Sequence, residues 1–225
     1  MLNAKELLGV DIDAEIFILS LTHRSFSNEN GGCPTNERLE FLGDAVLELA
    51  ITKKIFHDYP DQPEGALTKI RSAVVSEPPL AKVAKDLGIG KLVLLGKGED
   101  LNGGREKASI LSDAFEAILG AIYLTNGFEV AEKFILDKLG DILEDVVEHH
   151  RNIDTKSQLQ ALAHKLNKGE VLYAYDSFGP DHQKRYKAAV SFEKSPDFIA
   201  SAEADSKKKA SLLAAQKALE KLQVK

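Results

Sequence analysis

The stretch NERLEFLGDAVLEL, residues 36–49, combines the apolar spacing of a buried helix with a stripe of acids. Each helical residue turns the side-chain direction by about 100°, which places Glu37, Glu40, Asp44 and Glu48 on one face. Like charges four residues apart destabilise a helix by roughly a few tenths of a kcal/mol per pair. A solvated acidic face is the simplest interpretation, but it usually carries Lys or Arg at that spacing. The uncompensated repulsion therefore favours a functional role.

A second pair of acids occurs in SILSDAFEAILGAIYL, residues 109–124. Asp113 and Glu116 lie three residues apart on an otherwise apolar helix. Gly120 is close to their face, and Gly43 is its counterpart on the first helix. Small residues let two helices approach closely, so we expect the two acid pairs to come together.

Such a cluster of four carboxylates requires protons or a cation. Two carboxylates about 5 Å apart repel each other by roughly 3 kcal/mol at an effective dielectric constant near 20. Ligands that are all oxygen favour Mg²⁺, or Mn²⁺ as a substitute, over zinc. Because no nucleophilic Ser or Cys is evident, the pattern suits metal-assisted phosphoryl chemistry. An acidic rim that only repels or binds a partner would have a similar pattern.

The charge of the chain is divided unevenly along its length. Residues 1–150 contain 15 Lys and Arg against 26 Asp and Glu, whereas residues 151–225 contain 14 against 9. An acidic part is therefore joined to a basic part, and this asymmetry predicts that the basic part binds a polyanion.

The composition is typical of a globular protein, with 44% hydrophobic and 28% charged residues. No run approaches the roughly 18 apolar residues of a membrane span, and charged residues interrupt the first 25 positions where a signal peptide would lie. A lone cysteine, Cys33, excludes an internal disulfide. We expect a cytoplasmic protein with no membrane partner.

The periodicity changes near residue 150. Residues 1–150 read as helices separated by short turn signals, and no strand is evident there. Residues 151–225 read as a helix, three short strands and a final helix. We therefore predict an α+β chain in which an all-α domain, 1–150, precedes a small α-β-β-β-α domain, 151–225. The boundary is expected in the polar stretch EHHRNIDT, residues 148–155.

At residues 36–49 the chain resembles the ribonuclease III family, whose signature is this acidic helix. The resemblance continues through LTHRS (21–25), PEGALTKIRSAVVSE (63–77), GGREKASILSDAFEAILGAIYL (103–124) and GPDHQKRY (179–186). It implies an endonuclease domain followed by a double-stranded-RNA-binding domain, assembled as a homodimer with two catalytic centres in one valley. Each centre is expected to cut one strand and leave 5′-phosphate and 3′-hydroxyl ends with short 3′ overhangs, in rRNA precursor processing and mRNA turnover.

The resemblance also implies roles for individual residues of the nuclease domain. Four acids match the metal-binding and catalytic acids of the family, with Asp44 holding metal-bound water and Glu116 acting in catalysis: Glu40, Asp44, Asp113 and Glu116. Three further residues match the acids of the cleft rim and an aromatic that fills a pocket of the partner subunit: Glu37, Glu64 and Phe41. Glu48 receives no role.

For the basic domain, the resemblance implies three regions that contact duplex RNA. They are represented by Gln160 on the first helix, His182 in the loop GPDH, and Lys207 and Lys208 at the start of the last helix. Such domains recognise the shape of A-form RNA through 2′-hydroxyl and phosphate contacts.

Two departures from the family pattern concern RNA affinity. Ala161 stands where many members have Glu, and the acidic stretch ASAEAD, residues 200–205, replaces a basic one close to the lysines. We expect the isolated tail to bind RNA modestly. Two alternatives to the enzyme are a non-catalytic RNA-binding regulator, disfavoured by the intact acids, and an acidic homodimeric interaction module, disfavoured by GPDH and SKKKA.

Overall fold

The computed structural model describes residues 4–180 and 183–223, without the side chains of 151–154, 196, 197 and 223. The chain divides into two compact units, Met1–Val146 and Val147–Lys225. In the described part of the first unit every regular element is helical, apart from one isolated β-bridge between Thr22 and Leu94. The elements before the long helix α9 are α1 (Ala4–Leu8), α2 (Ala14–Ser20), α3 (Arg24–Glu29), α4 (Glu37–Asp58), α5 (Glu64–Val74), α6 (Glu77–Asp86), η1 (Ile89–Lys91), α7 (Lys97–Leu101), η2 (Gly104–Glu106) and α8 (Ala108–Asn126).

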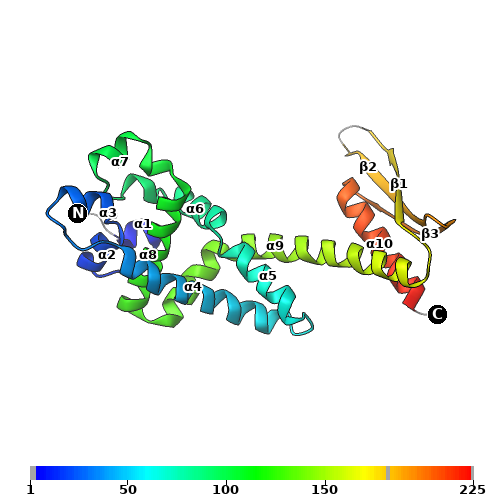
Figure 1. The fold of residues 1–225 in the computed structure, drawn as a ribbon, viewed down its shortest axis with the longest axis horizontal. Helices are drawn as coiled ribbons and strands as arrows, with labels where there is room; N and C mark the ends of the chain where they lie inside the picture. Colours follow the sequence, from blue (N-terminus) through cyan, green and yellow to red (C-terminus); the bar gives the residue numbers. More distant parts are fainter. Residues whose placement is uncertain (1–3, 181–182, 224–225) are drawn as a thin grey trace. The chain divides into compact units, whose positions relative to one another are not determined.

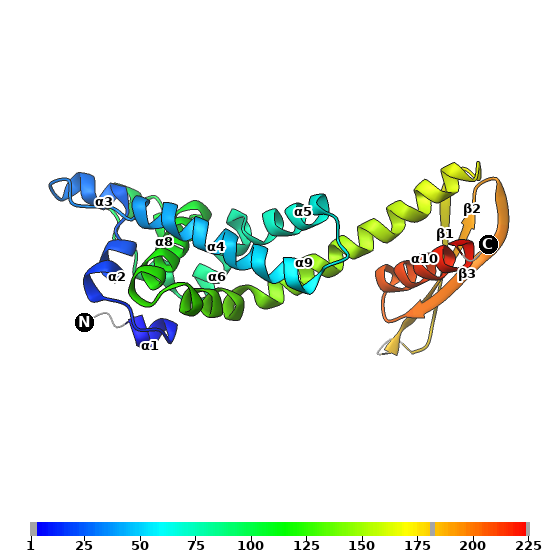
Figure 2. The ribbon, with the colours of Figure 1, turned by 90° about the horizontal axis from the view of Figure 1, so that it is seen from below.

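The core of the first unit is built around α4 and α8, which pack against each other (Figure 1, Figure 2). The buried positions of α4 recur at intervals of three and four residues, as expected for one face of a helix: Leu39, Gly43, Val46, Leu47, Ala50, Ile51 and Ile55. Helix α8 is buried around most of its circumference. The two acid-bearing helices are thus the central pair of the unit.

Helix α8 is also long and apolar enough, by length and composition alone, to span a membrane. It is the one such helix among the described residues, and 61% of the apolar stretch is buried inside the protein. Burial of this kind is typical of a core helix, and the acids Asp113 and Glu116 interrupt its apolar surface.

Helix α9 runs from Phe128 to Lys165 without interruption. It therefore includes the polar stretch 148–155, in which we expected the domain boundary. Neither Gly nor Pro occurs between residues 141 and 168, so no residue there breaks the backbone hydrogen bonds of the helix. The helix ends where Asn167 and Gly169 adopt positive φ angles of 60° and 77°.

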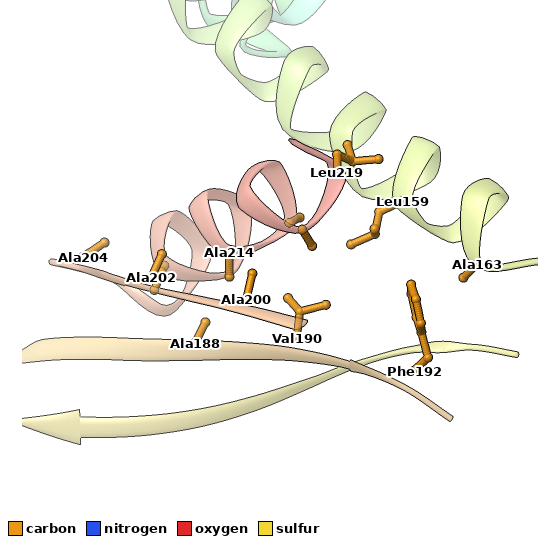
Figure 3. Close-up of a cluster of buried hydrophobic side chains, with 13 residues drawn as sticks. Leu159, Ala163, Ala188, Val190, Phe192, Ala200, Ala202, Ala204, Ala214 and Leu219 are labelled. Carbon is orange, nitrogen blue, oxygen red and sulfur yellow. The ribbon is translucent and has the colours of Figure 1, made fainter. Parts of the chain in front are cut away.

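The second unit contains the predicted three-stranded sheet, and the predicted α+β class is confirmed. Strands β1 (Val171–Phe178), β2 (Arg185–Phe192) and β3 (Ser195–Ala204) form an antiparallel sheet in the order β1-β2-β3. Alternate side chains of β2 and β3 point into one core with α10 (Lys207–Gln223) and the end of α9 (Figure 3). Most residues of this core are alanine, which brings α10 close to the sheet.

Candidate active site

Two glycines allow α4 and α8 to approach closely enough to join their acids. A Cβ atom on Gly43 would overlap the carbonyl oxygen of Glu116, and one on Gly120 would overlap the carbonyl oxygen of Leu39. The backbones are therefore in direct contact at these points. The two helices therefore approach each other at the small residues, as the sequence predicts.

Three of the four predicted acids form a tight group. Glu40, Asp113 and Glu116 each offer a carboxylate oxygen, and these oxygens all lie within 4.8 Å of one another. All three side chains are partly buried. A hard divalent cation with oxygen ligands fits this arrangement by the chemistry of the donors.

The electrostatics of the group show why it favours a cation. Burial raises the pKa of Glu116 from 4.5 to about 8, and the charges of Asp44, Glu40 and Asp113 add to the rise. Burial also raises the pKa of Glu40, helped by Asp113, Glu37 and Asp44. Burial raises the pKa of Asp113 as well, against a hydrogen bond from Ser112 that lowers it. Burial therefore disfavours the ionised form of all three carboxyls, and a bound cation would offset this cost.

Asp44 lies at the edge of this group. Its side chain is exposed, and it is not one of the three acids whose oxygens converge. Its negative charge nevertheless raises the pKa values of Glu116 and Glu40, so it lies near both. This position suits a residue that acts beside the cation.

A side pocket of about 520 Å³ opens beside the acids and shares Glu40 and Asp113 with them. Glu37 lines it and accepts a hydrogen bond of 2.8 Å from the Thr35 hydroxyl. Its lining also includes four charged or titratable residues for which the sequence predicts no role: His23, Arg24, Glu99 and Lys107. Arg24 and His23 belong to the LTHRS segment, but only the fold brings that segment to the acids.

The second predicted rim acid, Glu64, lies in a different depression. It begins α5, accepts a hydrogen bond of 2.8 Å from Thr68, and lines an apolar pocket of about 440 Å³ with Phe56 and Arg71. Glu37 and Glu64 therefore do not line a common pocket. Phe41 projects from α4 with 81% of its surface exposed.

In the second unit, Gln160 is engaged within the domain. Its side-chain oxygen accepts a hydrogen bond from the Val171 amide (3.0 Å), and its nitrogen donates to the Gly169 carbonyl (3.3 Å) and lies 2.9 Å from His164 Nε2. The side chain thus joins the end of α9 to the start of β1. Its proposed RNA contact stays a prediction.

The predicted RNA-binding lysines lie at the start of α10. The Lys207 ammonium is 5.8 Å from the centre of the Tyr175 ring, and Lys208 Nζ is 3.3 Å from His149 Nδ1. Neither contact neutralises the lysine. The remaining predicted contact, His182, lies outside the described residues.

A helical unit with a partly buried acid cluster, followed by a small basic α-β-β-β-α unit, defines a class of two-domain nucleic-acid enzymes. Comparisons with known proteins support this class. A family model described as Ribonuclease-III-like matches residues 13–143, and one described as Double-stranded RNA binding motif matches residues 155–222. The chain therefore belongs to the ribonuclease III family of double-stranded-RNA endonucleases.

Relatives and solved structures support this assignment. The chain is 48% identical over 188 residues to "Ribonuclease 3" of Nocardia farcinica, covering 82% of this chain and 78% of that protein. It is 46% identical over 210 residues to "Ribonuclease 3" of Leifsonia xyli, covering 93% and 88%. The chain is also similar to a structure of the nuclease domain of ribonuclease III from Campylobacter jejuni, which is described as showing structural flexibility in a region involved in dimer formation. The match covers 61% of this chain and 94% of that chain. Its sequence identity is 43% and its TM-score 0.57.

Proposed function

We propose that the chain is a Mg²⁺-dependent endoribonuclease that hydrolyses both strands of duplex RNA to 5′-phosphate and 3′-hydroxyl ends with short 3′ overhangs. The observation that carries this proposal is the convergence of Glu40, Asp113 and Glu116, whose oxygens lie within 4.8 Å of one another. Partly buried acids with raised pKa values are expected where a cation belongs, and among residues 4–180 and 183–223 none of the three forms an ion pair with Lys or Arg.

In this proposal the three converging acids hold the cation, and Mn²⁺ can replace Mg²⁺. When bound, the cation supplies Lewis acidity, which lowers the pKa of water and offsets negative charge at the phosphate. Exposed Asp44 accepts a hydrogen bond from water at the edge of the site and so orients it. Glu116, whose pKa is raised to about 8, would hold the cation as a carboxylate, and its proton would then pass to solvent.

Cleavage of two strands requires two centres, so the proposed enzyme is a homodimer. Phe41 exposes an aromatic ring that a single chain leaves in water. Near it in sequence, an apolar pocket of about 490 Å³ is lined by residues of α2, α4, α8 and the segment before α4: Leu19, Pro34, Thr35, Arg38, Leu39, Leu42 and Leu124. The Phe41 ring of a second copy would suit the apolar lining of this pocket. The nuclease domain from C. jejuni also has a region involved in dimer formation.

The second unit is proposed to select duplex RNA through Lys207, Lys208 and His182. We place the enzyme in the cytoplasm, where rRNA precursors and mRNAs are its expected substrates. The match of residues 155–222 to a double-stranded RNA binding motif supports duplex RNA as the substrate.

The proposal is tested by incubating the purified full-length protein with long duplex RNA in Mg²⁺, in Mn²⁺ and in EDTA. We expect short duplex products with 5′-phosphates in both metals and none in EDTA. Glu116→Gln keeps the shape of the side chain but removes its charge, so it should bind RNA without cutting it.

The outcomes separate the competing functions. Cleavage that continues in EDTA would overturn the metal mechanism. Binding without cleavage in every divalent ion would instead identify a non-catalytic regulator that retains the fold.

A further inference from the structure

The side pocket beside the acid cluster has a rigid frame. The Asn36 amide donates a hydrogen bond to the Thr22 carbonyl (2.9 Å), which ties the start of α4 to the segment before α3. The Gly96 amide donates to the Ser25 hydroxyl (2.9 Å), which ties the start of α3 to the segment before α7. Arg24 lies between these two anchors, so its backbone is held on both sides.

The guanidinium of Arg24, in contrast, is left without a close partner. No hydrogen bond or ion pair to it occurs among residues 4–180 and 183–223. The other flexible cation of the pocket, Lys107, forms an ion pair with Glu99. Arg24 therefore contributes the unpaired positive charge of the pocket.

Arg24 is close enough to act on the acid cluster electrostatically. Its charge lowers the pKa values of Glu40 and Asp113, although burial outweighs this effect in both. The same two acids line the pocket and belong to the proposed metal site. An RNA strand with one phosphate at the metal site would thus place its adjacent ribose-phosphate unit beside Arg24.

We propose that this side pocket binds one ribose-phosphate unit of the RNA strand next to the scissile bond, with Arg24 contacting its phosphate. This inference rests on the proposed endonuclease function. A planar guanidinium offers five donors in a geometry that suits phosphate oxygens. The Glu37 carboxylate, which also lines the pocket, can accept a hydrogen bond from a ribose 2′-hydroxyl. The volume of about 520 Å³ lies in the usual range for ligand pockets, about 300–1,000 Å³.

The first test measures binding of duplex RNA by the full-length protein in EDTA over a range of salt concentrations. Arg24→Gln should weaken binding several-fold and reduce the slope of log K against log salt by about 1 for each site engaged, because one phosphate contact is lost. Arg24→Lys keeps the positive charge but not the planar guanidinium, so it should restore most of the salt slope and only part of the affinity. Lys82→Gln is the matched control, since it removes one exposed charge of α6 that lines none of the three pockets described. An unchanged slope in Arg24→Gln would overturn the proposal.

The second test identifies the phosphate. Short RNA duplexes carry a single uncharged methylphosphonate linkage, placed in turn at each position around the cleavage site. At a linkage adjacent to the scissile one, the substitution should weaken binding by the wild-type protein several-fold and binding by Arg24→Gln no further. Equal losses in both proteins at every position would show that Arg24 contacts no phosphate.

These measurements keep the two proposals separate, because neither requires cleavage. A wild-type protein that cuts RNA but shows no coupling between Arg24 and any linkage would refute the side pocket alone. A protein that shows the coupling but cuts nothing would refute the endonuclease and retain only the phosphate contact of Arg24. Melting curves of Arg24→Gln that match the wild type exclude a loss of folding as the cause.

Discussion

Glu116 is the residue whose chemistry depends most on its surroundings. Burial, together with the charges of Asp44, Glu40 and Asp113, raises its pKa to about 8. Without a cation the folded protein therefore keeps a proton on this carboxyl at neutral pH. The unfolded chain, with an ordinary pKa near 4.5, does not.

This difference predicts how stability depends on pH. Because the folded state binds the extra proton, the free energy of unfolding contributed by Glu116 is greatest below pH 4.5. It falls as the pH rises toward 8. In EDTA, Glu116→Gln should therefore become progressively more stable than the wild type between about pH 5 and pH 8, with a constant difference above that. Thermal melting of both proteins at several pH values measures this.

Magnesium provides the control for that experiment. A cation that neutralises the carboxylate should stabilise the wild type more at pH 8 than at pH 6, because fewer protons then compete for the site. Glu116→Gln should gain less. Melting curves of the two proteins that stay parallel across the whole pH range would contradict the raised pKa.

The crossing of α4 and α8 makes the acid cluster possible. Gly43 and Gly120 are required at this crossing because a Cβ on either would enter the backbone of the facing helix. The two carboxylate pairs depend on this contact for their separation. A change in helix spacing should thus damage stability and metal binding together.

Gly43→Ala tests this dependence. The added methyl group overlaps the Glu116 carbonyl, so the free energy of unfolding should fall by about 3 kcal/mol or more, at the upper end of the cost of overpacking. Denaturant unfolding measures this loss, and a fluorescence or calorimetric titration with Mn²⁺ should show weaker metal binding.

Gly140→Ala is the matched control. Gly140 lies within α9, and a Cβ there meets nothing within 4 Å. This variant should be stabilised by about 0.5–1 kcal/mol, because alanine loses less backbone entropy than glycine in a helix. Equal effects of the two substitutions would show that the close approach at Gly43 is not required.

Acids close to the start of α10 lie beside lysines that could otherwise contact RNA. Lys209 Nζ lies 2.9 Å from Asp205 Oδ2, and this pairing holds the pKa of the Asp205 carboxyl below its usual range. Glu203 on β3 lies opposite Lys187 on β2 in the sheet register. The acidic stretch 200–205 thus provides counter-charges for nearby lysines.

Asp205→Asn should accordingly increase the affinity for duplex RNA. Removal of the carboxylate frees the Lys209 ammonium for a phosphate, so binding should strengthen several-fold and become more sensitive to salt. Glu220→Gln removes the same charge from an exposed position near the other end of α10 and should have a much smaller effect. Filter binding at two or more salt concentrations decides between them.

At the scale of the whole molecule, the exposed Phe41 ring predicts assembly. Its 81% exposure leaves an aromatic ring in water, which a second copy would cover. If the protein is the proposed dimer, Phe41→Asp should shift it toward monomer in sedimentation experiments and weaken two-strand cleavage. A wild-type protein that is monomeric at micromolar concentration would contradict the two-centre arrangement.

Much of this organisation is already present in the sequence. The period of apolar residues predicts the helices of the first unit and the three strands of the second, because side-chain direction follows local backbone geometry. The same rule places Glu40 and Asp44 on one helix face. The acids of the two helices and the candidate metal were likewise inferred without the fold.

Other features depend on which surfaces meet in three dimensions. Only packing shows that Glu40, Asp113 and Glu116 converge while Asp44 stays at the edge. Only packing brings Arg24 to a pocket shared with these acids. The sequence by itself determined the elements and the residue types of the site, since both follow from short-range periodicity. The tertiary structure alone decided which carboxylates are close enough to share a cation, because their separation is set by the contact of two backbones at Gly43 and Gly120.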